Sequence, residues 1–175
     1  LAARNYKAAI DAYQRAVQLK SGEAATLRLA NAYSSSGRED EALEILAQFV
    51  SRNPANLAAN RILASAYLEQ QDWRRAAAAL KMVQVRSGSE DALLMMELGR
   101  AHMGIGKPNE AVAYYYHGYR LQPLNPVITN ALGWAMLKAG ADRSVALDLL
   151  EKAAAMQPQN AIFKKRLEEA RPRRT

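Results

Sequence analysis

A repeat of about 34 residues runs through almost the whole of this 175-residue chain. Alanine recurs at intervals of 33 to 35 residues, and leucine recurs at intervals of 34 or 35. The two series are Ala9, Ala42, Ala76, Ala111 and Ala146, and Leu29, Leu63, Leu98, Leu132 and Leu167. Several residue series with one common period predict copies of one small supersecondary unit, each packing on the next.

Each unit has the pattern of two helices. The first, as in LAANRILASAYLEQ (57–70), carries apolar residues at helical spacing and ends near a glycine or a polar pair. The second, as in EDEALEILAQFVSRNP (39–54), stops at a proline, which cannot continue a helix. The small residue at the position of Ala42 lets the two helices approach closely. Four places later a larger residue fills the space between units, and these residues are Tyr13, Leu46, Leu80, Tyr115 and Leu150.

This pattern resembles the tetratricopeptide repeat family, whose motif is 34 residues long. The match is best over residues 27–54 and 94–123. The sequence departs from the motif where Phe49 and Val83 occupy a position for a small residue, and where Gln71 replaces the turn glycine. The resemblance implies an all-α fold, a right-handed superhelical solenoid of antiparallel helix pairs.

We therefore expect residues 1–175 to form a single solenoid. Its parts are a second helix of a truncated repeat (1–20), full repeats at 23–53, 56–87, 91–124 and 126–158, a capping helix (160–171) and a basic tail (172–175). In the capping helix, Ile162, Phe163 and Leu167 are expected to cover the last repeat. The charged residues of the same helix, namely Lys164, Lys165, Arg166, Glu168 and Glu169, are expected to face water.

The N-terminal end has no such cap. Ile10, Tyr13 and Val17 are therefore expected to be partly bare, which predicts either further repeats upstream in the parent protein or self-association through this end. The chain starts without an initiator Met or a signal peptide, so we interpret it as a piece of a longer protein, and whether a targeting segment has been left out stays open. The compartment, cytoplasmic or periplasmic, stays open.

Four tyrosines between positions 114 and 119 raise the question of base stacking. In the repeat register Tyr115 is a core position between helices, and an aromatic residue at helical spacing is usually core. Stacked bases also need phosphate-binding Lys and Arg nearby, and only Lys107 and Arg120 are available. We therefore expect packing rather than nucleic-acid binding.

Composition excludes several classes of function. The chain has no cysteine, so disulfides, thiolate catalysis and cysteine-ligated metals are excluded. No apolar run approaches the roughly 20 residues of a membrane span. The net charge of +7 is concentrated in residues 161–175, with six basic and two acidic residues, so it predicts a basic tail rather than a basic face.

The sequence gives no sign of an enzyme, a metal site or a cofactor site. His102 and His117 lie on different predicted helices with no carboxylate at metal-ligand spacing. Acidic pairs such as Asp40-Glu41 and Glu90-Asp91 stand at predicted helix starts, where capping explains them. The stretch GIGKP lacks the strand and the glycine spacing that phosphate binding requires.

Stacked helix pairs leave a concave surface lined by the first helices, and in the tetratricopeptide repeat family that surface commonly holds a partner peptide. The repeat register places these residues there: Leu27, Asn31, Arg61, Ser65, Leu93, Met96, Arg100, Met103, Asn130 and Trp134. Arg61 and Arg100 offer planar donors to a carboxylate, whereas Met96, Met103 and Trp134 offer apolar contact or pack against neighbouring helices. The lysine–asparagine pairing of the members that clamp chaperone tails is absent from every unit.

The favoured function is thus a non-catalytic scaffold that binds a protein or peptide partner in the groove. Alanine-rich, cysteine-free repeats resemble those of bacterial proteins that assemble envelope or export machinery. The alternative is a nucleic-acid-binding helical repeat that uses exposed tyrosines together with Arg171, Arg173 and Arg174 of the basic tail.

Overall fold

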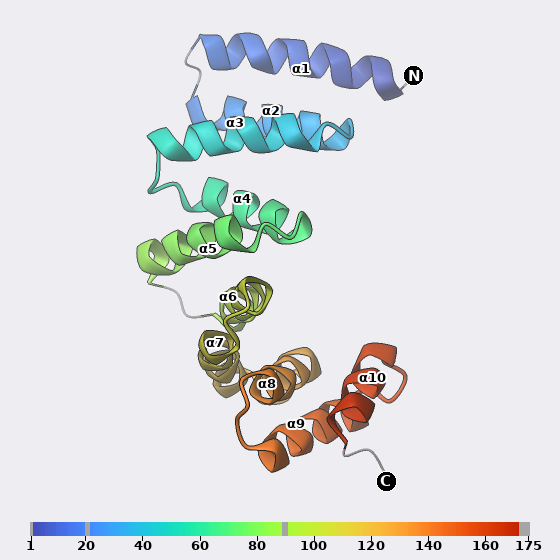
Figure 1. Cartoon of the computed structure of the whole chain (residues 1–175). Helices are drawn as coiled ribbons and strands as arrows, with labels where there is room; N and C mark the ends of the chain where they lie inside the picture. Colours follow the sequence, from blue (N-terminus) through green and yellow to red (C-terminus); the bar gives the residue numbers. More distant parts are fainter. Residues whose placement is uncertain (1, 20–21, 89–90, 172–175) are drawn as a thin grey trace.

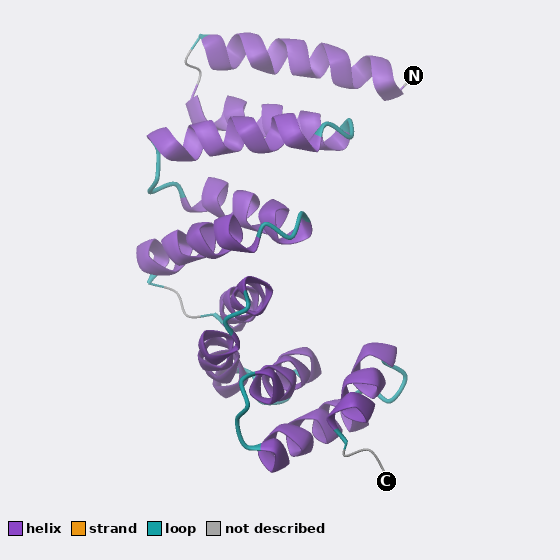
Figure 2. Ribbon diagram, in the orientation of Figure 1, coloured by secondary structure: helices purple, strands orange, loops and turns teal. Residues whose placement is uncertain are grey.

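The computed structural model describes residues 2–19, 22–88 and 91–171. This part of the chain forms ten α-helices joined by short loops, and it contains no strand (Figure 2). The helices are α1 (Ala2–Gln18), α2 (Gly22–Ser35), α3 (Glu39–Arg52), α4 (Leu57–Glu69), α5 (Trp73–Ser87), α6 (Ala92–Ile105), α7 (Pro108–Leu121), α8 (Pro126–Lys138), α9 (Arg143–Met156) and α10 (Ala161–Ala170).

From α1 at the top of Figure 1 the helices follow one another downward as far as α9, and α10 lies above α9 at the level of α8. Each first helix (α2, α4, α6, α8) packs against the second helix of its own pair, and each second helix packs against the next first helix. The lower part of the stack turns to one side, and α10 packs against α9 and α8 (Figure 1). The all-α solenoid that the repeat predicts is confirmed.

The recurring alanines and leucines form the contacts between helices. Ala76, Ala111 and Ala146 are completely buried, and Leu98 is as well. An alanine at a helix crossing allows close approach of the backbones, whereas each fully buried leucine contributes about 1.5–3 kcal/mol by leaving water. A periodic sequence thus produces a continuous core, because every unit buries its apolar stripe on its neighbour.

Short polar side chains start most of the helices. Asp91 Oδ1 accepts a hydrogen bond of 2.7 Å from the N–H of Leu94, which confirms the capping role predicted for this residue. Glu90 lies outside the described residues. Asp40 and Glu41 lie in the first turn of α3, where their negative charge compensates the helix dipole. Other N-caps are Asn56, Asp72, Asn125, Asp142 and Asn160.

One turn between paired helices is strained. Gly37, Gly106 and Gly140 close three of these turns with positive φ angles of +77°, +84° and +70°. Gln71 occupies the same place in the second repeat and adopts a φ of +59°. A side chain in the left-handed region costs roughly 1–2 kcal/mol because its Cβ approaches the following carbonyl. The departure from the motif at this position therefore has an energetic consequence.

Three predictions about the ends of the stack are wrong. Ile10 is 5% exposed rather than partly bare, because α2 packs against that face of α1. Tyr13 and Val17 pack on the same cluster but are only half-buried, so they are partly bare as expected. Ile162 is 62% exposed, whereas Phe163 is 4% exposed. Adjacent residues point about 100° apart around a helix, so both cannot face the last repeat.

Arg166 is the third of these residues. It is half-buried, and its Nη1 donates a hydrogen bond of 2.6 Å to Oδ1 of Asn130 on α8. The capping helix therefore directs a charged side chain toward α8 instead of into solvent.

Candidate partner-binding groove

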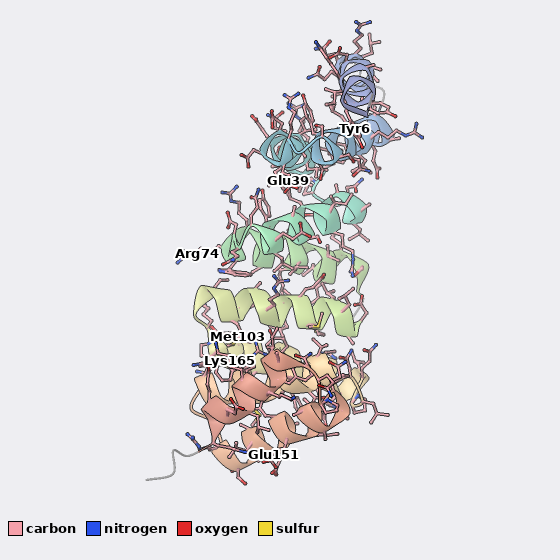
Figure 3. The ribbon with its side chains drawn as sticks, turned by 90° about the vertical axis from the view of Figure 1, so that its right-hand side faces the viewer. Tyr6, Glu39, Arg74, Met103, Glu151 and Lys165 are labelled. Carbon is pink, nitrogen blue, oxygen red and sulfur yellow. The ribbon has the colours of Figure 1, made fainter. Side chains whose placement is uncertain are left out.

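Two cavities lie at equivalent places in the repeat, each between a first helix, its second helix and the following first helix. We call them the N-terminal cavity and the C-terminal cavity. The N-terminal cavity lies between α2, α3 and α4. The C-terminal cavity lies between α6, α7 and α8, and Trp73 of α5 and Arg166 of α10 also line it. Figure 3 views the molecule from the side toward which the lower part of the stack turns, with Met103 of α6 and Lys165 of α10 labelled close together in that view.

The N-terminal cavity is small and acidic. Its volume is about 80 Å³, and its lining contains Glu39 and Glu69 but no lysine or arginine. Leu46 and Ile62 are among its apolar lining residues, while Asn31 provides a polar side chain. This cavity leaves little room for a ligand side chain.

The C-terminal cavity is larger and basic. Its volume is about 270 Å³, and its lining contains Arg100 and Arg166 but no carboxylate. The guanidinium carbon of Arg100 lies 5.8 Å from the ring centre of Trp73, and that of Arg166 lies 5.4 Å from Trp134. Lys138 Nζ lies 4.4 Å from the Trp134 ring. The full lining is Trp73, Arg100, Met103, Gly104, Tyr115, Ala131, Trp134 and Arg166.

Small residues in the sequence create this space. A Cβ on Gly99 would lie 2.6 Å from the ring of Tyr115, so only glycine lets that ring lie flat on α6. Gly104 plays the same part for Trp73, whose indole occupies the place of a Cβ. Ala131 is the third small residue. It lines the C-terminal cavity at the repeat position where Ile62 lines the N-terminal cavity. The local sequence thus exchanges aliphatic filling for aromatic walls and an opening.

Burial shapes the electrostatics of the C-terminal cavity. It raises the pKa of Tyr115 to about 12, although the positive charges of Arg166 and Arg100 oppose the shift. Burial also lowers the pKa of Arg166, against the attraction of Tyr115 and Glu169. The two guanidiniums therefore act on one buried phenol from different helices.

The carboxylates that interact with Arg100 and Arg166, those of Glu97 and Glu169, are not part of the cavity lining. Burial raises the pKa of Glu97, while the charges of Arg61 and Arg100 lower it and that of Asp91 raises it further. Arg61 Nη1 also lies 3.8 Å from Asp91 Oδ2. Arg100 itself is exposed and donates a long hydrogen bond of 3.4 Å to the carbonyl of Leu68.

The residues expected to line the groove lie in different environments. Arg100, Met103 and Trp134 meet in the C-terminal cavity, and Asn31 lines the N-terminal cavity. Asn130 is completely buried beneath Arg166, so its side chain does not face the groove as expected. The remaining residues are half-buried (Leu27, Arg61, Met96) or exposed (Ser65, Leu93).

The sequence interpretation missed two residues of the C-terminal cavity. Trp73 belongs to a second helix, which the register excludes from the groove, and Arg166 belongs to the capping helix. One signal for Trp73 is present in the sequence, since it begins α5 directly after the N-cap Asp72 and so lies at the turn where the paired helices meet. Arg166 has no comparable signal.

The tyrosine cluster packs as expected. Tyr115 is 5% exposed and Tyr116 is 54% exposed, while Tyr114 and Tyr119 are half-buried against the core. Tyr119 also accepts a hydrogen bond of 3.0 Å from Lys152 Nζ. Only one ring of the four is therefore broadly accessible, too few for a stacking platform.

His102 is a packed residue of α6. Its ring centre lies 5.0 Å from that of Tyr114, and burial lowers its pKa. In the described ranges, no three His, Asp or Glu side chains gather closely enough to hold a metal ion. No helix there is both long and apolar enough to cross a membrane.

These features define a helical-repeat solenoid with cavities between its successive helices. Sequence models described as "Tetratricopeptide repeat" match residues 27–92 and 63–126, and a second such model matches residues 1–52. The chain therefore belongs to the tetratricopeptide repeat family, as its sequence pattern indicated. Proteins of this family bind protein or peptide partners, and the fold is in general a non-catalytic interaction fold. No curated protein matches the chain significantly.

Several solved structures are similar to it. A structure of MamA aligns with a TM-score of 0.74 at 21% identity and covers 91% of each chain. A thermophilic TPR protein of Thermus thermophilus aligns with a TM-score of 0.60 at 24% identity, covering 94% of this chain and 90% of its own. YrrB, described as a TPR protein with an unusual peptide-binding site, aligns with a TM-score of 0.73 at 18% identity, covering 93% of this chain and 83% of its own. At such identities the likeness supports the fold alone.

Proposed function

We propose that this chain is a non-catalytic scaffold whose groove, formed by the first helices, binds a segment of a partner protein. The observation that carries the proposal is the C-terminal cavity, in which exposed Arg100 donors adjoin the rings of Trp73 and Trp134 and the thioether of Met103. Aromatic, Met and Arg side chains together are typical of surfaces that bury a partner's side chains. YrrB, with its own peptide-binding site, supplies a precedent on a similar fold.

The alternative of nucleic-acid binding has less support. Arg171 Nη2 donates a hydrogen bond of 3.0 Å to Glu151 Oε1, so this basic residue is already paired. Arg173 and Arg174 lie outside the described residues. Glu39, Glu69 and Glu97 lie on or beside the cavities and would repel a phosphate backbone.

The proposal is tested by selecting peptides from a random library against the purified chain and measuring their affinities by calorimetry. We expect peptides with micromolar or better affinity that compete with one another, because one groove is available to all of them. Charge reversal of Arg61 and Arg100 together should weaken them. Some loss of melting temperature is expected as well, because Arg61 lies 3.8 Å from Asp91 and both arginines lower the pKa of Glu97, so a thermal melt establishes that the variant is folded. A library that yields no binding peptide would contradict the proposal.

The link to bacterial envelope assembly or export stays a prediction from the resemblance of the repeats. The full-length gene product tests it most simply. A signal segment or a lipid-anchor segment at its start would support the link, and a neighbouring cytoplasmic enzyme domain would count against it.

A further inference from the structure

The C-terminal cavity contains charges of one sign only. Two guanidiniums, Arg100 and Arg166, line it, and Lys138 lies at its edge against Trp134. Each guanidinium has five N–H donors, and the hydrogen bonds to the carbonyl of Leu68 and to Asn130 use only part of them. Donors remain for a ligand with carboxylate oxygens, which accept hydrogen bonds and carry the opposite charge.

The walls of the cavity are apolar. The indoles of Trp73 and Trp134, the thioether of Met103 and the methyl group of Ala131 surround the space between the arginines. The volume of about 270 Å³ is slightly below the roughly 300–1,000 Å³ of pockets that hold a whole small-molecule ligand. The space therefore suits one or two side chains of a longer polypeptide.

The cavity is held in this shape by its own packing. Tyr115 is fixed against Gly99, and Trp73 is fixed against Gly104. Arg166 is anchored by its hydrogen bond to buried Asn130, which orients the guanidinium before any ligand arrives. Binding in such a site costs little ordering of side chains.

From this arrangement, and building on the proposed function, we infer that the C-terminal cavity binds an internal acidic–aromatic segment of the partner. An aromatic side chain of the segment enters between Trp73 and Trp134. An aspartate or glutamate beside it pairs with Arg100 and Arg166 in the same step. Arg100, Lys138 and Arg166 lie against the two indoles and can pair with more than one carboxylate. A C-terminus supplies only one terminal carboxylate, which is why we favour an internal segment with acidic side chains.

Other occupants fit the charges less well. A second copy of this chain has a net charge of +7 and would meet a basic cavity. A single strand of nucleic acid has anionic groups and stacking bases, but its backbone would run past Glu97 and toward the acidic N-terminal cavity. An acidic–aromatic polypeptide matches both the cations and the aromatic walls.

The two tryptophans of the chain both line this cavity, so tryptophan emission reports on it selectively. The probe is a synthetic peptide of alternating glutamate and phenylalanine, acetylated and amidated so that it has no terminal charge. The matched peptide has glutamine in place of glutamate. We expect a saturable change in emission with the glutamate peptide, and an affinity about 10-fold or more weaker for the glutamine peptide.

Variants locate the interaction. Arg100→Glu should weaken the glutamate peptide about 10-fold or more, whereas Arg28→Glu, which reverses an exposed charge on α2, should leave its affinity unchanged. Arg166→Gln keeps an amide donor for Asn130 and should weaken the peptide as well. A thermal melt of each variant establishes that it is folded, and Arg100→Glu alone decides the question if Arg166→Gln unfolds α10.

Four results would overturn the inference. They are equal binding of the glutamine peptide, an unchanged affinity in Arg100→Glu, binding only by a peptide with a free terminal carboxylate, and tighter binding of oligothymidylate at this site. The proposed function fails separately. If library-selected peptides bind by calorimetry but leave tryptophan emission unchanged, the peptides bind at another part of the surface. In that case only the inference about the C-terminal cavity is wrong.

Discussion

The two cavities differ although they occupy the same place in the repeat. The N-terminal cavity has about 80 Å³ and two glutamates, whereas the C-terminal cavity has about 270 Å³ and two arginines. At corresponding positions of the repeat the two cavities have different residues. The N-terminal cavity has Asn31, Leu46, Ile62 and Glu69 where the C-terminal cavity has Arg100, Tyr115, Ala131 and Lys138. One backbone arrangement thus presents two different surfaces.

The comparison shows how a repeat protein keeps its packing constant while the residues around a cavity vary. The motif residues at both places, such as Ala42 and Ala111, are buried and fix the helix crossing. Positions around them accept large changes of size and charge, because each unit needs only its apolar stripe to pack on the next. If this is correct, exchanging single residues between the two cavities should exchange their properties.

The largest expected effect concerns Gly99, whose counterpart in the N-terminal cavity is Ala30. In Gly99→Ala the new Cβ would lie 2.6 Å from the Tyr115 ring, which must move. Overpacking of this kind costs about 1–3 kcal/mol, partly offset by the better helix propensity of alanine. We expect a net loss of about 1–2 kcal/mol in the free energy of unfolding, measured by urea denaturation.

Adding Tyr115→Leu to Gly99→Ala restores the alanine–leucine pair found at Ala30 and Leu46. The double variant should be less destabilised than the sum of the two single variants by about 1 kcal/mol or more, since the two residues are in contact. Simple additivity would show that Gly99 does not position Tyr115.

The second exchange reduces the C-terminal cavity. Ala131→Ile introduces the side chain that the N-terminal cavity has at Ile62, and it should fill part of the space between Trp134 and Tyr115. We expect the glutamate–phenylalanine peptide to bind about 10-fold more weakly by tryptophan emission, while the melting temperature changes little because Ala131 is only half-buried. Ile62→Ala is the reciprocal control and should leave this affinity unaltered.

A smaller effect is expected at the turn between α4 and α5. Gln71→Gly relieves a left-handed backbone conformation at φ +59°, but it also increases the entropy of the unfolded chain. The balance should stabilise the protein by about 0.5–1 kcal/mol, seen as a rise of roughly 1–4 °C in melting temperature. Gln70→Gly is the matched control, because Gln70 ends α4 in a right-handed conformation and should only lose stability. A drop in melting temperature in Gln71→Gly would show that the turn is not strained.

The smallest effect concerns charge alone. Glu69→Lys places a positive charge at the N-terminal cavity, at the position that corresponds to Lys138 of the C-terminal cavity. For exposed side chains we expect only a few-fold tighter binding of the acidic peptide at low salt, and no difference at high salt. Glu44→Lys makes the same change of charge on α3, away from both cavity linings, and should have no effect. An effect that persists at high salt would point to direct contact instead of long-range attraction.

The fold could be predicted from the sequence because the repeat of about 34 residues runs through almost the whole chain and keeps alanine and leucine at the same positions. The spacing of the alanine and leucine series determines which helix faces meet, and these faces are buried in the structure. Errors arose where the repeat ends. Ile10, Ile162 and Arg166 lie in the first and last helices, whose surroundings differ from those of the helices inside the array. Their burial therefore depends on contacts that the repeat register does not describe.

The candidate site could be predicted only in part. Arg100, Met103 and Trp134 follow from the register, since they project from first helices. Trp73 enters from a second helix because Gly104 leaves room for its ring, and Arg166 enters because α10 packs against α8. Such contacts depend on tertiary geometry, which a one-dimensional pattern does not contain.

The most direct measurement is the nuclear magnetic resonance spectrum of the two indole N–H groups during titration with a library-selected peptide. The chain has two tryptophans, and both line the C-terminal cavity. If a partner segment binds there, both indole signals shift and saturate together at the affinity that calorimetry gives. If the peptide binds while both signals stay in place, the groove does not use this cavity.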